Sequence, residues 1–159
     1  MDVIKQFFTS EDKFAQHCGI ELVDVQAGWA KTSMKIKSHH INGAKTVHGG
    51  AIFTLADFAF AVASNSHGSL AMGINTSVHF VKAATKGTLY AEINTSVHFV
   101  KAATKGTLYA EAREQSINPK LASYTVLVTD DAGDTVALFQ GMVYRKKEPI
   151  IPDDSPVSC

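Results

Sequence analysis

Hydrophobic and polar positions divide the chain into one long apolar helix and a strand-rich remainder. From Gly49 to Ala63 nearly every residue is apolar, and a helix that is apolar on every side belongs in the centre of a fold. The pattern predicts a central helix over about residues 50–66 that ends near Gly68. Residues 30–37 alternate instead with the two-residue period of a half-buried strand.

The elements on either side of this helix are shorter. Ser10 is a possible N-cap for a short helix from Ser10 to His17, with Gly19 as its stop. Further strands are predicted at Ile20–Val25, Tyr124–Val128 and Thr135–Tyr144, the last two joined by a hairpin turn at residues 130–134. One long helix followed by antiparallel strands predicts an α+β domain in which the sheet wraps around the helix.

One segment of the chain occurs twice. Residues Ile74–Glu92 recur without a change as Ile93–Glu111. Structural repeats diverge and need about three copies to bury a core, so two identical copies indicate a recent or deliberate duplication, or an error in the recorded sequence. We therefore expect a single domain over residues 1–148 with this insertion inside it, and a tail over residues 149–159.

Strand direction predicts how the insertion is accommodated. If both native junctions are kept, Ile74–Val81 stays joined to the helix and Thr107–Glu114 stays joined to the downstream sheet. Residues around 85–103 are then expected to leave the core sheet, where they are cut first in limited proteolysis or pair with another subunit. Lengthening a flexible loop costs only about 0.6 kcal/mol per doubling, far less than rebuilding a sheet.

Composition excludes several functional classes. Lys plus Arg equals Asp plus Glu at 15 each, which gives no basic footprint for nucleic acid. The two cysteines, Cys18 and Cys159, are too few for a disulfide framework. The apolar stretch of the central helix is too short to span a bilayer, and the first 20 residues do not resemble a signal peptide. These features favour a cytoplasmic protein with no membrane or nucleic-acid partner.

The central helix carries the candidate chemistry. Asp57 is its one carboxylate, and burial there should raise its pKa and make it a better base. The first N–H groups of a helix have no intrahelical partner, and Gly49 and Gly50 let a substrate carbonyl approach them closely. The Gly49 N–H is therefore a candidate oxyanion donor.

Asn42-Gly43, followed by His48-Gly49-Gly50 and Asp57, resembles the motif of acyl-CoA thioesterases of the hotdog fold, in particular the phenylacetate-pathway (PaaI-like) type. The resemblance implies an acyl-CoA thioesterase that hydrolyses an aryl- or medium-chain acyl-CoA without a cofactor. It assigns Asp57 as nucleophile or general base, Asn42 to orient water or the thioester, and His48 to position the thioester carbonyl.

Spacing alone predicts a shared site. Eight residues separate Gly49 from Asp57, about 12 Å along one helix, whereas base and oxyanion donor must both lie within about 3 Å of the reacting atoms. We therefore expect a symmetric homodimer in which Asp57 of one protomer meets Gly49 and Asn42 of the other. The resemblance further implies a dimer of dimers.

Other interpretations remain open from the sequence. Asp57 could be a structural acid, and His48 a satisfied polar group at a helix start. His39, His40 and His48 lack a nearby carboxylate or cysteine at ligand spacing, so no metal site is expected. Hotdog dehydratases would pair the helix acid with a histidine about five residues on, where Val62 stands. A non-catalytic acyl-CoA-binding or assembly module of the same fold is the alternative function. Phe58, Phe60 and Phe80 could line an aryl or a medium-chain pocket.

Overall fold

The computed structural model describes residues 1–80 and 106–151. Its elements, in chain order, are α1 (Asp2–Glu11), α2 (Lys13–His17), β1 (Ile20–Gln26), β2 (Trp29–Lys35), a 3₁₀ turn (Ser38–His40), α3 (Gly49–Asn65), β3 (Ser69–Phe80), β4 (Thr107–Ile117), β5 (Leu121–Thr129) and β6 (Thr135–Pro149). The predicted α+β class is confirmed, and the predicted central helix differs from α3 by a single residue at each end.

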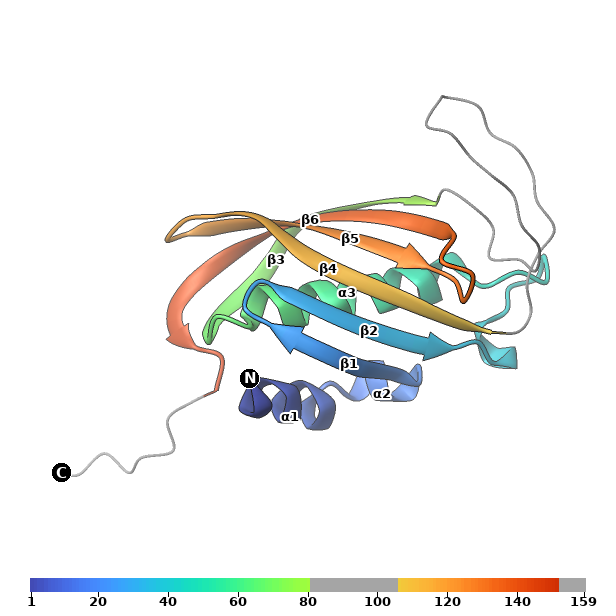
Figure 1. Cartoon of the computed structure of the whole chain (residues 1–159), viewed down its shortest axis with the longest axis horizontal. Helices are drawn as coiled ribbons and strands as arrows, with labels where there is room; N and C mark the ends of the chain where they lie inside the picture. Colours follow the sequence, from blue (N-terminus) through green and yellow to red (C-terminus); the bar gives the residue numbers. More distant parts are fainter. Residues whose placement is uncertain (81–105, 152–159) are drawn as a thin grey trace.

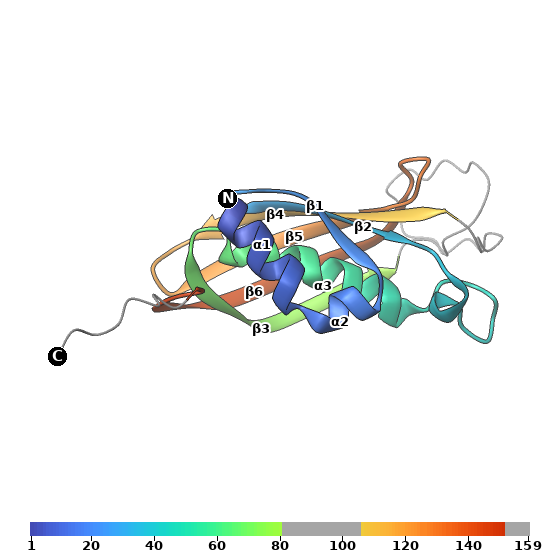
Figure 2. The same cartoon turned by 90° about the horizontal axis from the view of Figure 1, so that it is seen from below.

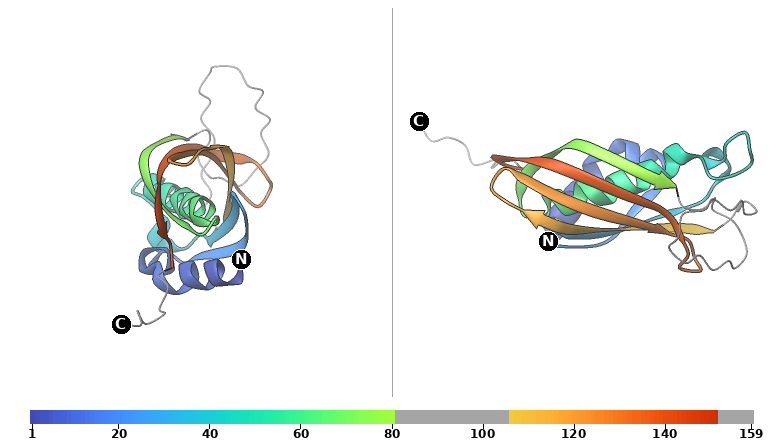
Figure 3. Two further views of the ribbon diagram at one scale, coloured as in Figure 1. Left: turned by 90° about the vertical axis from the view of Figure 1, so that its left-hand side faces the viewer. Right: turned by 90° about the horizontal axis from the view of Figure 1, so that it is seen from above.

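Six antiparallel strands form one sheet in the order β1-β2-β4-β5-β6-β3. The sheet curls around α3, as the end-on view of Figure 3 shows. β3 follows α3 directly but crosses to the outside of β6, so β1 and β3 are the two edges of the sheet. This is the hotdog architecture, in which one curved antiparallel sheet wraps around a long central helix (Figure 1).

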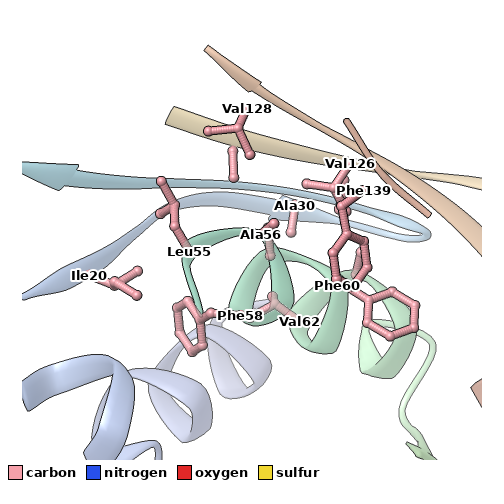
Figure 4. Packing of buried hydrophobic residues seen from close by; sticks show 14 of the residues in the cluster. Ile20, Ala30, Leu55, Ala56, Phe58, Phe60, Val62, Val126, Val128 and Phe139 are labelled. Carbon is pink, nitrogen blue, oxygen red and sulfur yellow. The ribbon is translucent and has the colours of Figure 1, made fainter. Parts of the chain in front are cut away.

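The core lies between α3 and the concave face of the sheet. Alternate residues of β5 point inward and are buried, while their neighbours are more exposed. Leu55, Ala59 and Val62 on α3 are completely buried, and Figure 4 shows Leu55 and Val62 in one cluster with Val126, Val128 and Phe139. This packing fixes the rotation of α3 and hence which of its residues remain accessible.

The N-terminus differs from the prediction of a single helix capped by Ser10. Two helices occur there, and Asp12 is the N-cap of the second, its carboxylate accepting a hydrogen bond from the Ala15 N–H at 2.9 Å. The Ser10 hydroxyl bonds instead to the Phe7 carbonyl and the Glu11 carboxylate. Gly19 does end the second helix, in the left-handed conformation with φ 65°. Figure 2 shows α1 and α2 lying over α3 on the side that the sheet leaves open.

Each copy of the duplicated segment supplies a different strand. The first copy provides most of β3, and the second provides the start of β4. Both predicted junctions are therefore kept, with β3 continuing from α3 and β4 forming a hairpin with β5. The predicted excluded segment, residues 85–103, lies outside the described residues. At the other end, the Ile150 N–H donates to the Gly68 carbonyl at 3.0 Å, so the first residues after β6 are attached to the fold.

Candidate active site

The His48-Gly49-Gly50 sequence forms the first turn of α3. His48 is its N-cap, with extended backbone, and its Nδ1 accepts a hydrogen bond from the Gly50 N–H at 2.8 Å. Because Nδ1 is an acceptor, the ring proton lies on Nε2 in the neutral imidazole, and the ring is exposed. His48 therefore both caps the helix and presents an N–H donor to the outside.

Gly49 leaves its backbone N–H uncommitted, since among the described residues no acceptor binds it. The ring of Phe80, at the end of β3, lies against this glycine: a Cβ built at position 49 would be 3.1 Å from the Phe80 Cζ. A side chain at this position would therefore need the Phe80 ring to shift by a few tenths of an ångström. A free N–H beside an exposed aromatic ring at the positive end of a helix is suited to receiving a polarised carbonyl oxygen.

Asn42 organises the loop that precedes α3. Its Oδ1 accepts hydrogen bonds from the N–H groups of Ala44 and Thr46, and its Nδ2 donates to the Thr46 hydroxyl at 2.9 Å. The amide keeps one Nδ2 hydrogen that no described residue accepts. This turn-building use of the side chain was not predicted from the sequence, although an Asn-Gly pair is a recognisable turn signal.

The three histidines near this loop do not converge on one point. His40 is buried, accepts from the Lys37 N–H through Nδ1 and donates to the Cys18 carbonyl through Nε2. Burial lowers the pKa of His40, which favours this neutral, doubly bonded form. In residues 1–80 and 106–151, no group of three or more potential ligands lies together in a geometry that could hold a metal ion.

Asp57 lies near the middle of α3 and is partly buried. Burial raises the pKa of its carboxyl above the ordinary value, and the negative charge of Asp12 raises it further. Within the described part of the chain, no hydrogen bond or ion pair involves this carboxylate. An acid that is partly desolvated and unpaired in this way is a stronger base than an exposed one.

Asp57 belongs to a stripe of α3 that the fold leaves uncovered. Gly50, Thr54, Asp57 and Ala61 recur at helical spacing and are all partly or fully exposed. The flank toward β6 and β3 is aromatic, with Phe53 packed on Phe139 at 5.7 Å between ring centroids. The structure thus places Asn42, His48 and Gly49 at one end of the stripe and Asp57 about 12 Å along it.

The two prominent surface cavities lie elsewhere. One, of about 530 Å³, is lined by Gln16, Gly19, Ile20, Glu21, Ser33, Lys35, Lys37 and Thr107. The other, of about 240 Å³, lies on the convex face of the sheet near the β5–β6 turn. Neither is lined by the candidate residues.

Two of the three phenylalanines proposed to line an acyl pocket belong to the core. Phe58 packs on Phe8 with ring centroids 6.2 Å apart, and Phe60 packs on Tyr124 and Phe139. Both are almost fully buried, and Figure 4 shows them within the core cluster. Phe80 and Phe53 are the aromatic side chains exposed beside the stripe.

A second cluster of polar side chains, not predicted from the sequence, lies at the other end of α3. The Glu114 carboxylate accepts from the Tyr124 hydroxyl at 2.8 Å and contacts the His67 Nε2 at 2.7 Å. Burial raises the pKa of Tyr124, so its hydroxyl stays protonated and donates. Ser66 accepts from the Gly28 N–H at 2.8 Å. These bonds join the residues just after α3 to the sheet, and β4 to β5.

Comparison with known proteins identifies the family. Residues 44–96 match the family model described as thioesterase superfamily. A relative from Archaeoglobus fulgidus, provisionally described as an esterase, is 36% identical over 149 residues, which cover 94% of this chain and 85% of the relative. The acyl-coenzyme A thioesterase PaaI of Escherichia coli is 35% identical over 71 residues, 45% of this chain and 51% of that protein.

The fold comparison agrees. The solved structure of the E. coli PaaI protein, from the phenylacetic acid degradation operon, superposes with a TM-score of 0.77 at 26% identity and covers 91% of both chains. No described helix is long and apolar enough to cross a membrane. These relatives and the wrapped sheet agree with the spacing of Asn42, His-Gly-Gly and Asp57. The chain therefore belongs to the thioesterase superfamily, as a PaaI-like thioester hydrolase of the hotdog fold.

Proposed function

We propose that the chain hydrolyses acyl-CoA thioesters to the free acid and CoA at a site shared between two protomers. The observation that carries this proposal is the open stripe of α3, which holds an unpaired carboxylate at Asp57 and a free N–H at Gly49. The acyl-CoA class follows from the PaaI relative, whose name specifies acyl-coenzyme A.

Each residue has a defined role in the proposed reaction. The thioester carbonyl oxygen accepts the Gly49 N–H, with the Nε2–H of His48 as a second donor. In one route Asp57 takes a proton from water as the water attacks the carbonyl carbon; in the other Asp57 attacks that carbon itself, and water hydrolyses the resulting acyl-Asp57 anhydride once CoA has left. In both routes the CoA thiolate leaves, and the free Nδ2 hydrogen of Asn42 orients the water or the thioester.

The outer edge of β3 supports the shared site. β3 pairs with β6 on one side, while the main-chain groups of its other side face outward at the edge of a sheet. It is 12 residues long and exposes Met72, Ile74 and Phe80. A long apolar edge strand is prone to pair with another strand, and antiparallel pairing with a second β3 would place a partner against the open stripe. Association of two such dimers is the corresponding proposal for a tetramer.

The acyl group is proposed to lie against Phe80 and Phe53, the aromatic rings that flank the stripe. Both an aryl-acetyl and a medium straight-chain group fit an apolar wall of this kind. Thiol release measured on phenylacetyl-CoA and octanoyl-CoA distinguishes them by the ratio of kcat/KM values. Binding of both esters without thiol release would favour the non-catalytic acyl-CoA-binding module instead.

Position 49 offers a clean test of the shared site. Gly49 is the first residue of α3 and follows an extended residue, so the backbone is compatible with a proline there, which removes the N–H but also places a Cβ against Phe80. Gly49→Ala is the matched control, because it places a Cβ against Phe80 yet keeps the N–H. We expect Gly49→Pro to lose activity roughly 10²–10³-fold relative to Gly49→Ala.

Complementation then tests which protomer supplies each group. Asp57→Asn and Gly49→Pro subunits, each inactive alone, should form mixed dimers with one intact site. In a statistical mixture half of the dimers are mixed, so activity should recover to about a quarter of the wild-type value. Confirmed mixed dimers without activity would show that each site lies within one chain.

A further inference from the structure

The loop that leads into α3 is a short antiparallel hairpin over residues 40–48. Near its tip the Asn42 N–H donates to the Thr46 carbonyl at 2.8 Å. At its base the His48 N–H donates to the His40 carbonyl at 2.7 Å. One arm therefore carries Asn42 and the other ends at His48, so the position of the hairpin sets the position of both candidate site residues.

The side chain of His40 anchors the base of this hairpin. The residue is only 3% exposed, and its two ring nitrogens bond to the residues that follow α2 and β2. Nδ1 accepts the Lys37 N–H at 3.0 Å, and Nε2 donates to the Cys18 carbonyl at 2.9 Å. Burial lowers the pKa of His40, so the ring stays neutral and keeps one acceptor nitrogen and one donor nitrogen.

The two ring bonds have different reach. The bond to Lys37 closes the 3₁₀ turn, together with the His40 N–H, which donates to the Lys37 carbonyl at 3.0 Å. The bond to Cys18 spans 22 positions in the sequence and ties the turn to the end of α2. Because α2 contacts both β1 and the body of α3, the Cys18 bond is the one that fixes the hairpin relative to the rest of the protomer.

We propose that His40 is a positioning residue for thioester hydrolysis, which holds the hairpin so that Asn42 and the first turn of α3 keep their places at the site. This inference rests on the proposed function, since the groups that it positions are those proposed to act on the substrate. Misplacing a catalytic group by about 1 Å can cost about 10²-fold in rate. His40 is buried, so it acts through the hairpin and not on the substrate itself.

Asparagine and glutamine at position 40 separate the two ring bonds. Asparagine has an acceptor oxygen at the δ position, where it can replace Nδ1 toward Lys37, whereas glutamine has a donor at the ε position, where it can replace Nε2 toward Cys18. His40→Leu removes both groups. His39→Asn, at an exposed histidine one residue away, is the matched control. Glu114→Ala controls for lost stability, because Glu114 is bonded just past the opposite end of α3.

We expect kcat to fall about 10- to 10²-fold in His40→Leu, with KM nearly unchanged, because oxyanion stabilisation is realised in the transition state. His40→Gln should retain most of the wild-type kcat because it keeps the Cys18 bond, and His40→Asn should lose nearly as much as His40→Leu. His39→Asn and Glu114→Ala should both retain the wild-type kcat. Rates are measured on octanoyl-CoA and phenylacetyl-CoA, well below the lowest melting temperature of the set.

NMR of the free protein separates this inference from the proposed function. The Gly49 amide resonance, assigned by its loss in Gly49→Pro, reports on the first turn of α3 without any substrate. It should move in His40→Leu and His40→Asn, and stay in place in His39→Asn and Glu114→Ala.

Wild-type kcat or an unmoved Gly49 resonance in His40→Leu would overturn the inference, and so would a larger loss of kcat in His40→Gln than in His40→Asn. If His40→Leu does not fold, the order of the glutamine and asparagine variants decides alone. A moved resonance in a protein that hydrolyses neither CoA ester would instead overturn the proposed function.

Discussion

At its first turn α3 presents an uncommitted N–H of Gly49 and an exposed His48 ring, whereas just past its last turn Ser66 and His67 are bonded to other elements. The two ends share one helix and similar small polar residues. The difference is that polar groups at the C-terminal end form hydrogen bonds within the fold, whereas the Gly49 N–H and the His48 Nε2 at the N-terminal end remain available. Along α3, the groups without a partner are the ones suited to act on a substrate.

The largest effect that would sharpen this contrast is expected at Asp57. Asp57→Asn keeps the volume and removes the base, so kcat should fall roughly 10²–10⁴-fold. Stability should not fall with it: the folded-state pKa of Asp57 is raised, so its ionised form opposes folding at neutral pH. Thiol release and thermal unfolding measure the two effects. Wild-type hydrolysis by Asp57→Asn would show that the carboxylate is structural.

At the C-terminal end of α3, a substitution is expected to lower stability and to leave activity nearly unchanged. Glu114→Ala removes the acceptor of the buried Tyr124 hydroxyl and of His67, which should lower the free energy of unfolding by about 1–3 kcal/mol. Urea unfolding measures it, with kcat/KM at 25 °C expected to change little. Glu114→Gln keeps an acceptor oxygen and should lose less. A stability loss no larger than that of Glu111→Ala, on the outer face of the same strand, would contradict the assigned role of the cluster.

Variants of His48 test whether one side chain both caps α3 and donates a hydrogen bond to the substrate. His48→Ala removes the N-cap and should lower stability by about 1 kcal/mol, whereas His48→Asn keeps a capping oxygen and should restore most of it. Neither variant has the imidazole Nε2–H, so both should lose activity to a similar extent. If His48→Asn recovers activity along with stability, His48 is a cap and nothing more.

The smallest effect is expected from the duplicated segment, whose first copy supplies part of β3 and whose second copy supplies the start of β4. Because the copies are identical, deleting any 19 consecutive residues within 74–111 yields the same shorter chain. That chain keeps the sequences of β3 and β4 and shortens the connection between them from 26 to 7 residues, so its free energy of unfolding should change by about 1 kcal/mol. Denaturant titration of both chains measures it. A change of several kcal/mol would show that the insertion is part of the core.

Much of this arrangement could be predicted from local sequence. The bounds of α3 followed from an apolar run opened by His48-Gly49-Gly50, and the 130–134 hairpin from its turn residues. The first helix was missed because residues 2–11 carry no distinctive start signal, and the cap was assigned to Ser10 although Asp12 makes the bond. Pattern alone gives no means of choosing between two capping residues two positions apart.

Long-range contacts account for what the sequence could not predict. The pairing of Glu114 with His67 joins residues 47 positions apart, and no local pattern anticipates it. Phe58 and Phe60 looked suitable for an acyl pocket, but the rotation of α3 against the sheet buries them and leaves Phe53 and Phe80 exposed. Asn42 was recognised as important, while its bonds within its own loop depend on a backbone conformation that sequence spacing does not specify.

The free edge of β3 has a consequence for how the protein behaves at different concentrations. An exposed apolar strand invites uncontrolled association, and the proposed pairing of two β3 strands would satisfy that edge while completing the catalytic site. Protection from aggregation and acquisition of activity would then be one event. Specific activity should therefore decline on dilution below the dimer dissociation constant, so that an isolated subunit is silent and turnover itself reports on assembly.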